Sequence, residues 1–201
     1  MTANFSTRGH SPNTLDHDLA RHFPELLKFE STPEMEASAL YKELRPEVDR
    51  ILNSIVIENL SVPPGVAGGL SPASGDISGI ISAVAWNLER GNVFEGIREA
   101  LQNHPDLSNK DLYLLTELDY GMARSGNRFV AKELAESLKL NYAFVPVYIA
   151  LQKGSGVESA VEGENTRSIH GLAMFSRYPM KNVHNLPLPN GKDKMWGKEK
   201  R

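Results

Sequence analysis

The chain has 201 residues, of which 40% are hydrophobic, so it is long enough for one globular domain with an appendage. It contains no cysteine, which excludes disulfides, thiolate zinc sites and a cysteine nucleophile and leaves oxygen or imidazole groups to hold any metal. The formal charge of −3 lacks the basic footprint of a duplex-binding protein, and no apolar run approaches the roughly 20 residues that cross a bilayer, so we expect a cytoplasmic protein without a membrane span.

Residues 1–60 are predicted to form an N-terminal helical extension. A short helix is expected over residues 15–28, and a second helix begins at Thr32 and reaches Ile55. Pro46 interrupts the second helix at a point where a kink would fall. Apolar residues at spacings of three and four give this helix a single stripe, formed by Leu40, Leu44, Val48, Ile51, Leu52 and Ile55. The pattern leaves two uses open: the stripe docks on the following domain, or it forms a dimerisation or partner surface.

Residues 61–79 are rich in proline, glycine and serine, which is the composition of a linker. From residue 80 to residue 201 the pattern alternates between short apolar runs and amphipathic segments. The runs predict strands at 80–86, 112–116, 142–151 and 171–176, and the amphipathic segments predict helices at 93–101 and 127–138. A polar, glycine-rich loop over residues 152–167 is of the kind that lines or covers a site. We therefore expect a domain of the α+β class after the linker.

Polar side chains follow two of the predicted strands. Asn87 comes directly after the first strand, and Glu117 follows the second. Ligand-binding groups collect at the carboxyl ends of strands in open sheets, so we expect these two side chains to approach one place. Taken singly, an Asn or a Glu in such a position is more often a turn residue or a solvated residue. Strand alternation would point Asp119 to the same side as Glu117, as a metal ligand or as the partner of an arginine.

Three segments follow one another in a fixed order: AWNLERG at 85–91, DLYLLTELD at 111–119 and HGLAMFSRYP at 170–179. In this order they resemble the N-terminal half of the endonuclease/exonuclease/phosphatase family, the DNase I-like phosphoesterases. A further segment, GMARSGNR at 121–128, is similar to one bacterial-type branch of that family. The resemblance covers roughly residues 78–180, and it implies part of a four-layer α/β/β/α sandwich.

The resemblance also implies an activity. Members of the family are metal-dependent phosphoesterases or nucleases that hydrolyse phosphodiesters or phosphomonoesters with a metal-activated water. By this likeness Glu117 is a direct ligand of Mg²⁺ or Mn²⁺, for which a carboxylate is a suitable hard oxygen donor. Asn87 positions the metal, its water or a phosphate oxygen, and Asp119 is a candidate further ligand. The substrate is then a phosphate ester of unknown class.

Two other groups of residues suit phosphate chemistry. Arg124, Asn127 and Arg128 lie where a loop enters a helix, so their side chains and free backbone amides suit phosphate binding. The alternative is that Ser125 or Asn127 caps the helix and the arginines pair with acids. His170 opens the last predicted strand, where imidazole could contact a phosphate or protonate a leaving group, or serve a structural role.

The second half of the family pattern is missing from this chain. It normally supplies an Asp-x-Asn pair and a late Asp-His pair, and neither occurs between Met180 and Arg201. We therefore expect this chain alone to be weakly active or inactive, and to leave an apolar sheet face uncovered. Three explanations stay open: a truncated product, a subunit completed by a second copy or another chain, or a degenerate relative that acts as a non-catalytic interaction module through the 32–55 helix.

Overall fold

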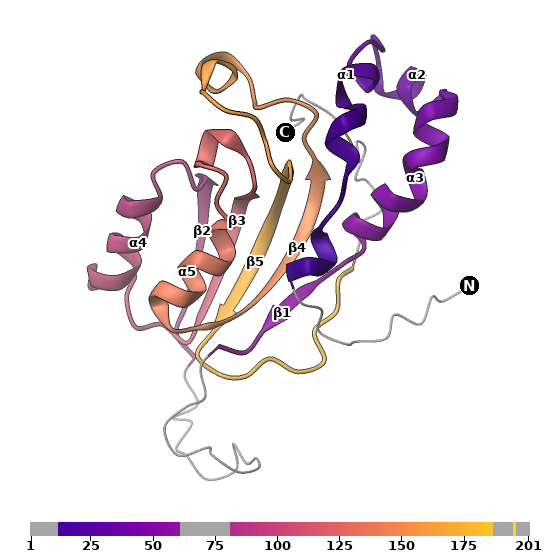
Figure 1. The fold of residues 1–201 in the computed structure, drawn as a ribbon. Helices are drawn as coiled ribbons and strands as arrows, with labels where there is room; N and C mark the ends of the chain where they lie inside the picture. The colour runs from indigo at the N-terminus through magenta and orange to yellow at the C-terminus, as the bar shows by residue number, and fades with distance from the viewer. Residues whose placement is uncertain (1–11, 61–80, 187–194, 196–201) are drawn as a thin grey trace.

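The computed structural model describes residues 12–60, 81–186 and 195 of the chain. Within these residues it combines helices with one five-stranded mixed sheet, which confirms the α+β class and the N-terminal helical part (Figure 1). The second sheet of the sandwich implied by the resemblance stays a prediction. The linker predicted over residues 61–79 lies outside the described residues.

The elements alternate along the chain much as the sequence predicts, with differences at their ends. The α-helices are α1 (Phe23–Leu26), α2 (Thr32–Ala37), α3 (Ala39–Leu52), α4 (Phe94–Asn103) and α5 (Val130–Leu138). The strands are β1 (Val56–Glu58), β2 (Ala83–Arg90), β3 (Leu112–Tyr120), β4 (Asn141–Ile149) and β5 (Ile169–Ser176). Short 3₁₀ turns are η1 (Pro12–Leu15), η2 (Leu19–His22), η3 (Ala123–Ser125) and η4 (Gly156–Ala160). The sequence pattern does not predict β1, because so short a strand shows no alternation.

The N-terminal helices are shorter than the sequence predicts. Residues 15–28 are helical only in short pieces, because Pro24 lacks an amide hydrogen and fits only the first turn of a helix. The helix expected over residues 32–55 is divided at Ser38, whose backbone is extended and whose hydroxyl accepts a hydrogen bond from a first-turn amide of α3 at 3.1 Å. Helix α3 instead continues through Pro46. A serine N-cap, and not the proline, sets the break.

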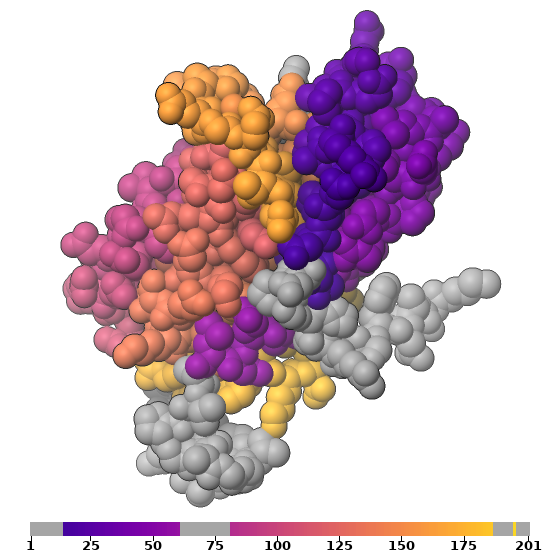
Figure 2. Space-filling model, viewed as in Figure 1, coloured from indigo at the N-terminus to yellow at the C-terminus, as the bar shows by residue number. Residues whose placement is uncertain are grey.

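The apolar stripe of α3 docks on the core of the same molecule. Leu44, Val48 and Ile51 are buried and belong to the same core cluster as the buried residues of the sheet. Helix α3 contacts β4, and Figures 1 and 2 show α1–α3 packed beside the edge of the sheet that β1 and β4 form. Burying each large apolar side chain contributes roughly 1.5–3 kcal/mol. Of the two uses that the sequence leaves open for the stripe, this packing supports docking within the chain.

The strand order is β1-β4-β5-β3-β2, with β2 parallel to β3 and all other neighbours antiparallel. Helices α4 and α5 lie against one face of the sheet (Figure 1). That face carries the core, in which the ring of Phe129 packs edge-to-face against Phe144, with centroids 5.0 Å apart. The hydrophobic core between the sheet and helices α4 and α5 therefore lies on one face of the sheet.

The opposite face of the sheet keeps apolar side chains exposed. Leu114 on β3 and Leu172 on β5 alternate with core residues, and they are 45% and 41% exposed. Asn87 pairs with Thr116, which lies two residues after Leu114 and so shares its face. The candidate site lies on this face, where the exposed apolar surface gives way to polar residues.

Three strands lose their regular register at one level of the sheet. The shifts fall between Asn87 and Arg90, between Leu115 and Leu118, and between Pro146 and Tyr148. Bulges of this kind re-aim side chains and are common next to active sites. Here the shift in β3 brings both Leu115 and Leu118 into the core and leaves Asp119 on the opposite face, paired with His170. The bulges therefore decide which polar residues gather at the site.

Candidate active site

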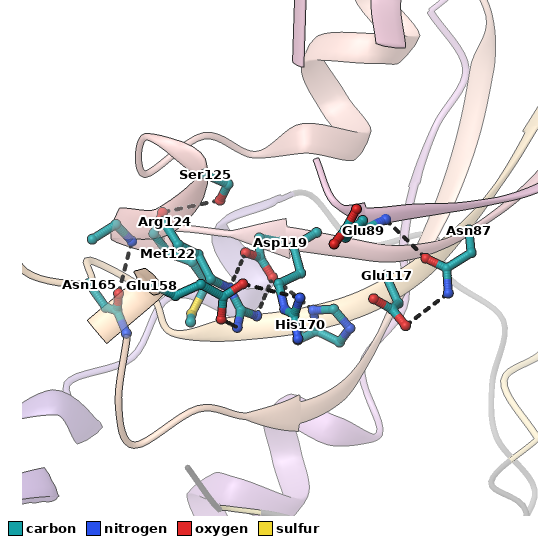
Figure 3. Close-up of polar contacts among 12 residues, drawn as sticks. Asn87, Glu89, Glu117, Asp119, Met122, Arg124, Ser125, Glu158, Asn165 and His170 are labelled. Atoms are coloured by element: carbon teal, nitrogen blue, oxygen red, sulfur yellow. Dashed lines mark hydrogen bonds and ion pairs between the residues drawn. The ribbon is translucent and has the colours of Figure 1, made fainter. Parts of the chain in front are cut away.

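Asn87 on β2 and Glu117 on β3 meet across the two parallel strands. Asn87 Nδ2 donates a hydrogen bond to Glu117 Oε1 at 2.8 Å, and Asn87 Oδ1 accepts one from the Glu89 amide at 2.9 Å (Figure 3). Asn87 is exposed and Glu117 is partly exposed. Within the described part of the chain, no further hydrogen bond or ion pair reaches the Glu117 carboxylate. Its second oxygen therefore keeps its full acceptor capacity.

The backbone at both bulges adopts an uncommon conformation. Glu117 has a φ of 57°, and Glu89 and Arg90 have φ values of 47° and 71°. This left-handed region is unfavourable for residues with a Cβ atom and costs about 1–3 kcal/mol each time it is occupied. Such strain persists where the surrounding structure imposes it, and it clusters at functional sites. Glu89, Arg90 and Glu117 thus have this conformation at the same ends of β2 and β3 as the polar side chains.

Asp119 lies at the centre of a buried network two residues beyond Glu117. Its Oδ1 accepts hydrogen bonds from His170 Nδ1 at 2.7 Å and Arg124 Nη2 at 2.9 Å, and its Oδ2 accepts one from Arg124 Nε at 2.8 Å. The side chains of Asp119, His170 and Arg124 are 0%, 5% and 4% exposed. Of the two roles that the sequence leaves open for Asp119, the structure shows the ion pair with an arginine.

The network sets the proton positions of its members. Burial raises the pKa of Asp119, but the hydrogen bonds from His170 and Arg124 outweigh burial and hold the pKa below its usual range. Burial lowers the pKa of Arg124, yet its hydrogen bond to Asp119 raises that pKa overall. An ionised Asp119 requires a hydrogen on His170 Nδ1, so the neutral ring carries its lone pair on Nε2. His170 is thereby oriented as a proton acceptor, and in the view of Figure 3 its ring lies between Asp119 and Glu117.

The loop between β4 and β5 lies over this network. Its turn η4 contributes Glu158, whose Oε1 lies 3.1 Å from Arg90 Nη1 and whose Oε2 lies 3.3 Å from Arg124 Nη1. Tyr148 of β4 stacks on His170 with ring centroids 4.7 Å apart. Sequence reasoning misses Tyr148 and Glu158, because neither belongs to a motif. The polar loop at 152–167 is the one signal that could have pointed to Glu158.

The structure separates the three residues predicted to bind phosphate together. Arg124 joins the buried network, whereas Arg128 Nη1 lies 2.5 Å from a carboxylate oxygen of Glu133 and its guanidinium stacks on the Phe94 ring at 4.4 Å. Asn127 Oδ1 accepts a hydrogen bond from the amide of Thr166 at 3.1 Å. These contacts match the part of the alternative in which the arginines pair with acids. The capping part is not found, because the N-cap of α5 is Phe129 and no side chain caps the helix.

A metal ion would find few donors here. In residues 12–60, 81–186 and 195 no three His, Asp or Glu side chains are grouped so that they could hold an ion. Asp119 is engaged by Arg124 and His170, whereas the Glu117 carboxylate accepts the hydrogen bond from Asn87. Mg²⁺ is nevertheless often bound through one or two carboxylates, with waters and substrate phosphates as its other ligands. A magnesium ion at Glu117 would therefore take most of its ligands from water and substrate.

A cleft of about 560 Å³ lies elsewhere, between η2, α1 and the loop after β4. Figure 2 shows it as the hollow between the indigo helices and the orange loop. Phe23 and Leu27 line one wall, and Lys153 and Ser168 line the other. Asn87, Glu117 and His170 do not line this cleft, so the candidate site and this hollow are separate features.

Comparisons with known proteins bring no relative to this chain. Neither the protein-family models, nor the curated proteins, nor the solved structures include a match. The helices in the described part of the chain are all too short or too polar to cross a membrane.

Proposed function

We propose that this end of the sheet is part of the active site of a divalent-metal phosphoesterase. The meeting of Asn87 and Glu117 beside the Asp119–His170 pair carries the proposal. A phosphate ester is anionic, and its hydrolysis needs positive charge on the phosphoryl oxygens together with an aligned nucleophile. An available carboxylate and an oriented imidazole supply complementary parts of that chemistry.

The role proposed for each residue follows from its contacts. Glu117 would hold Mg²⁺ or Mn²⁺. Asn87 orients the Glu117 carboxylate by donating a hydrogen bond to its Oε1 atom. When bound, such an ion supplies positive charge to the phosphoryl oxygens and acidifies a coordinated water. His170 accepts a proton at Nε2 or returns one to a leaving oxygen, and Asp119 keeps the imidazole in the required tautomer.

The small donor set predicts low affinity and slow turnover for this chain alone. Members of a catalytic unit act together, so a site that lacks several of them loses orders of magnitude in rate. Further donors would come from a second copy or from a completing chain. The substrate is a phosphate ester, and the net charge of −3 argues against duplex DNA.

Isothermal titration with MgCl₂ and MnCl₂ tests the proposal. We expect saturable heat with the wild type and its loss in Glu117→Gln, which removes the charge and keeps the shape of the side chain. Glu99→Gln is the matched control, because Glu99 is an exposed carboxylate on α4, away from the site. Equal heats for the wild type and Glu117→Gln would refute a metal site at Glu117.

A hydrolysis assay addresses the reaction separately. Bis-(p-nitrophenyl) phosphate and p-nitrophenyl phosphate report on diester and monoester cleavage with either metal. We expect slow, metal-dependent release of nitrophenol that falls by about 10²–10⁴-fold in His170→Asn, the usual contribution of a general acid or base. Release that is unaffected by His170→Asn and Glu117→Gln would count against the assigned roles.

A further inference from the structure

Glu158 occupies a position between two guanidinium groups. Its two carboxylate oxygens contact different arginines, with Oε1 3.1 Å from Arg90 Nη1 and Oε2 3.3 Å from Arg124 Nη1. All three side chains are largely withdrawn from solvent, at 13% exposed for Glu158, 12% for Arg90 and 4% for Arg124. An anion with two oxygens is thus held in a water-poor position beside the candidate site.

Arg124 does not depend on Glu158 for its orientation. Its Nε and Nη2 atoms donate to both oxygens of Asp119 at 2.8 and 2.9 Å, whereas its Nη1 atom lies at the longer distance of 3.3 Å from Glu158. The bidentate pair with Asp119 fixes the plane of the guanidinium. If Glu158 moved away, Arg124 Nη1 would still point at the position that the carboxylate had occupied.

The local charge favours an anion at that position. Glu158 places one negative charge between the guanidinium groups of Arg90 and Arg124. Removing a negative charge from between largely buried positive charges is unfavourable. A second anion that replaced Glu158 would restore this negative charge.

The turn that carries Glu158 makes few apolar contacts. Turn η4 has no buried residue, and the neighbouring Val157 is 88% exposed, so little apolar burial holds the turn down. Gly154 and Gly156 precede Glu158 with φ values of 142° and 58°, conformations that favour glycine. Segments with few buried apolar contacts open at low free-energy cost.

We propose that Arg90 and Arg124 form a phosphate-binding site, and that Glu158 occupies it until a phosphoryl group displaces the loop. Two phosphoryl oxygens can replace the two carboxylate oxygens, one on each guanidinium. Glu158 is then a built-in competitor that keeps the site closed without substrate. The choice of phosphate over other anions rests on the proposed function, whereas the anion site itself does not.

Titration of inorganic phosphate tests the site. The experiment uses the full chain in a buffer with EDTA, so that its outcome is independent of metal binding and of hydrolysis. We expect Glu158→Gln to bind phosphate at least about tenfold more tightly than the wild type, because the competing charge is gone. The double variant Glu158→Gln with Arg90→Gln should lose this gain. Equal affinity of the wild type and Glu158→Gln, with matching circular dichroism spectra, would overturn the proposal.

A second pair of variants tests displacement without changing any charge. A Cβ atom at Gly154 would lie 2.1 Å from Glu158 Oε2, whereas one at Gly156 would meet nothing within 4 Å. Gly154→Ala should therefore move Glu158 and tighten phosphate binding, while Gly156→Ala strains the same loop and leaves the affinity near that of the wild type. If both variants change the affinity equally, loop strain and not displacement of Glu158 is responsible, and the proposal fails.

Hydrogen exchange in the wild type locates the bound anion. Phosphate should speed amide exchange in residues 156–160, because binding displaces their turn. Binding without faster exchange there would place the anion elsewhere and reject the site. Parallel titrations with dimethyl phosphate and glycerol 3-phosphate separate a diester source from a monoester source. A retained phosphate site together with absent Mg²⁺ binding would reject the proposed hydrolysis but leave this inference standing.

Discussion

The Asn87–Glu117 pair and the Asp119–Arg124–His170 network lie two residues apart along β3, yet they are held in opposite ways. The pair is solvent-accessible, is joined by one hydrogen bond of 2.8 Å and contains a residue with a φ of 57°. The network is buried, and both oxygens of Asp119 are occupied by cationic or imidazole partners. One strand thus presents one carboxylate to ligands and encloses the next.

Because of this difference, the exposed pair suits ligand binding, and the buried network suits structural support. An exposed hydrogen bond on a strained backbone contributes little to stability, and it leaves an oxygen of Glu117 available. A buried ion pair is costly to break, and here it holds the imidazole of His170 in one tautomer. Mutation of Glu117 should therefore affect ligand binding more than stability. Mutation of Asp119 should affect stability more than ligand binding.

The largest expected effect is at Asp119. Asp119→Ala leaves the buried guanidinium of Arg124 without its main partner, which should lower the free energy of unfolding by about 3–5 kcal/mol. Urea denaturation followed by circular dichroism measures the loss. Asn87→Ala is the control from the exposed pair and should cost less than about 1 kcal/mol. Similar losses for the two variants would remove the distinction between network and pair.

A smaller effect of opposite sign is expected at Glu117. Glu117→Gly relieves the left-handed backbone conformation and should raise the free energy of unfolding by about 1 kcal/mol, while it abolishes metal binding. Glu117→Ala removes the same carboxylate but keeps the Cβ atom, so it should bring no such gain. The same urea experiment decides the matter, and a Glu117→Gly protein less stable than Glu117→Ala would show that the strain is not relieved.

The smallest effect is expected at His17, which contacts the loop between β4 and β5 close to the start of β5. His17 Nε2 lies 2.6 Å from the carbonyl oxygen of Arg167, and His17 Nδ1 accepts a hydrogen bond from the Leu19 amide at 3.2 Å. Burial lowers the pKa of His17 from its ordinary value of 6.5, so the unfolded chain takes up this proton at higher pH than the folded chain does. The stabilisation is complete above pH 6.5 and is lost as the pH falls through the lowered pKa.

We expect this loss to be the smallest of the three effects, because protonation of the ring gives up the single hydrogen bond from the Leu19 amide. His17→Asn removes the titrating group, so its unfolding free energy should vary less over the same pH range. Urea midpoints measured above and below pH 6.5 check this, and parallel pH profiles for the wild type and His17→Asn would contradict the assignment.

Much of the fold follows from local patterns in the chain. The strands around Trp86, Leu115 and Phe175 and the helices with stripes at Ile97 and Leu134 form close to where alternation and helical periodicity predict them. These signals are visible in sequence because each depends on neighbours a few residues apart. The N-terminal boundaries are predicted less well, since the choice between a break at Ser38 and one at Pro46 depends on a single cap.

By itself, the sequence determined the α+β class, because strand and helix periodicity are encoded locally. It placed Asn87 and Glu117 directly after two strands, whereas the structure has both residues inside longer strands, β2 and β3. Only the tertiary structure decided which polar groups meet. The aligned bulges turn Asp119 toward His170 and Arg124, and the loop after β4 brings Glu158 over Arg90. Register shifts and loop closure depend on contacts between residues far apart in the chain, which no local pattern records.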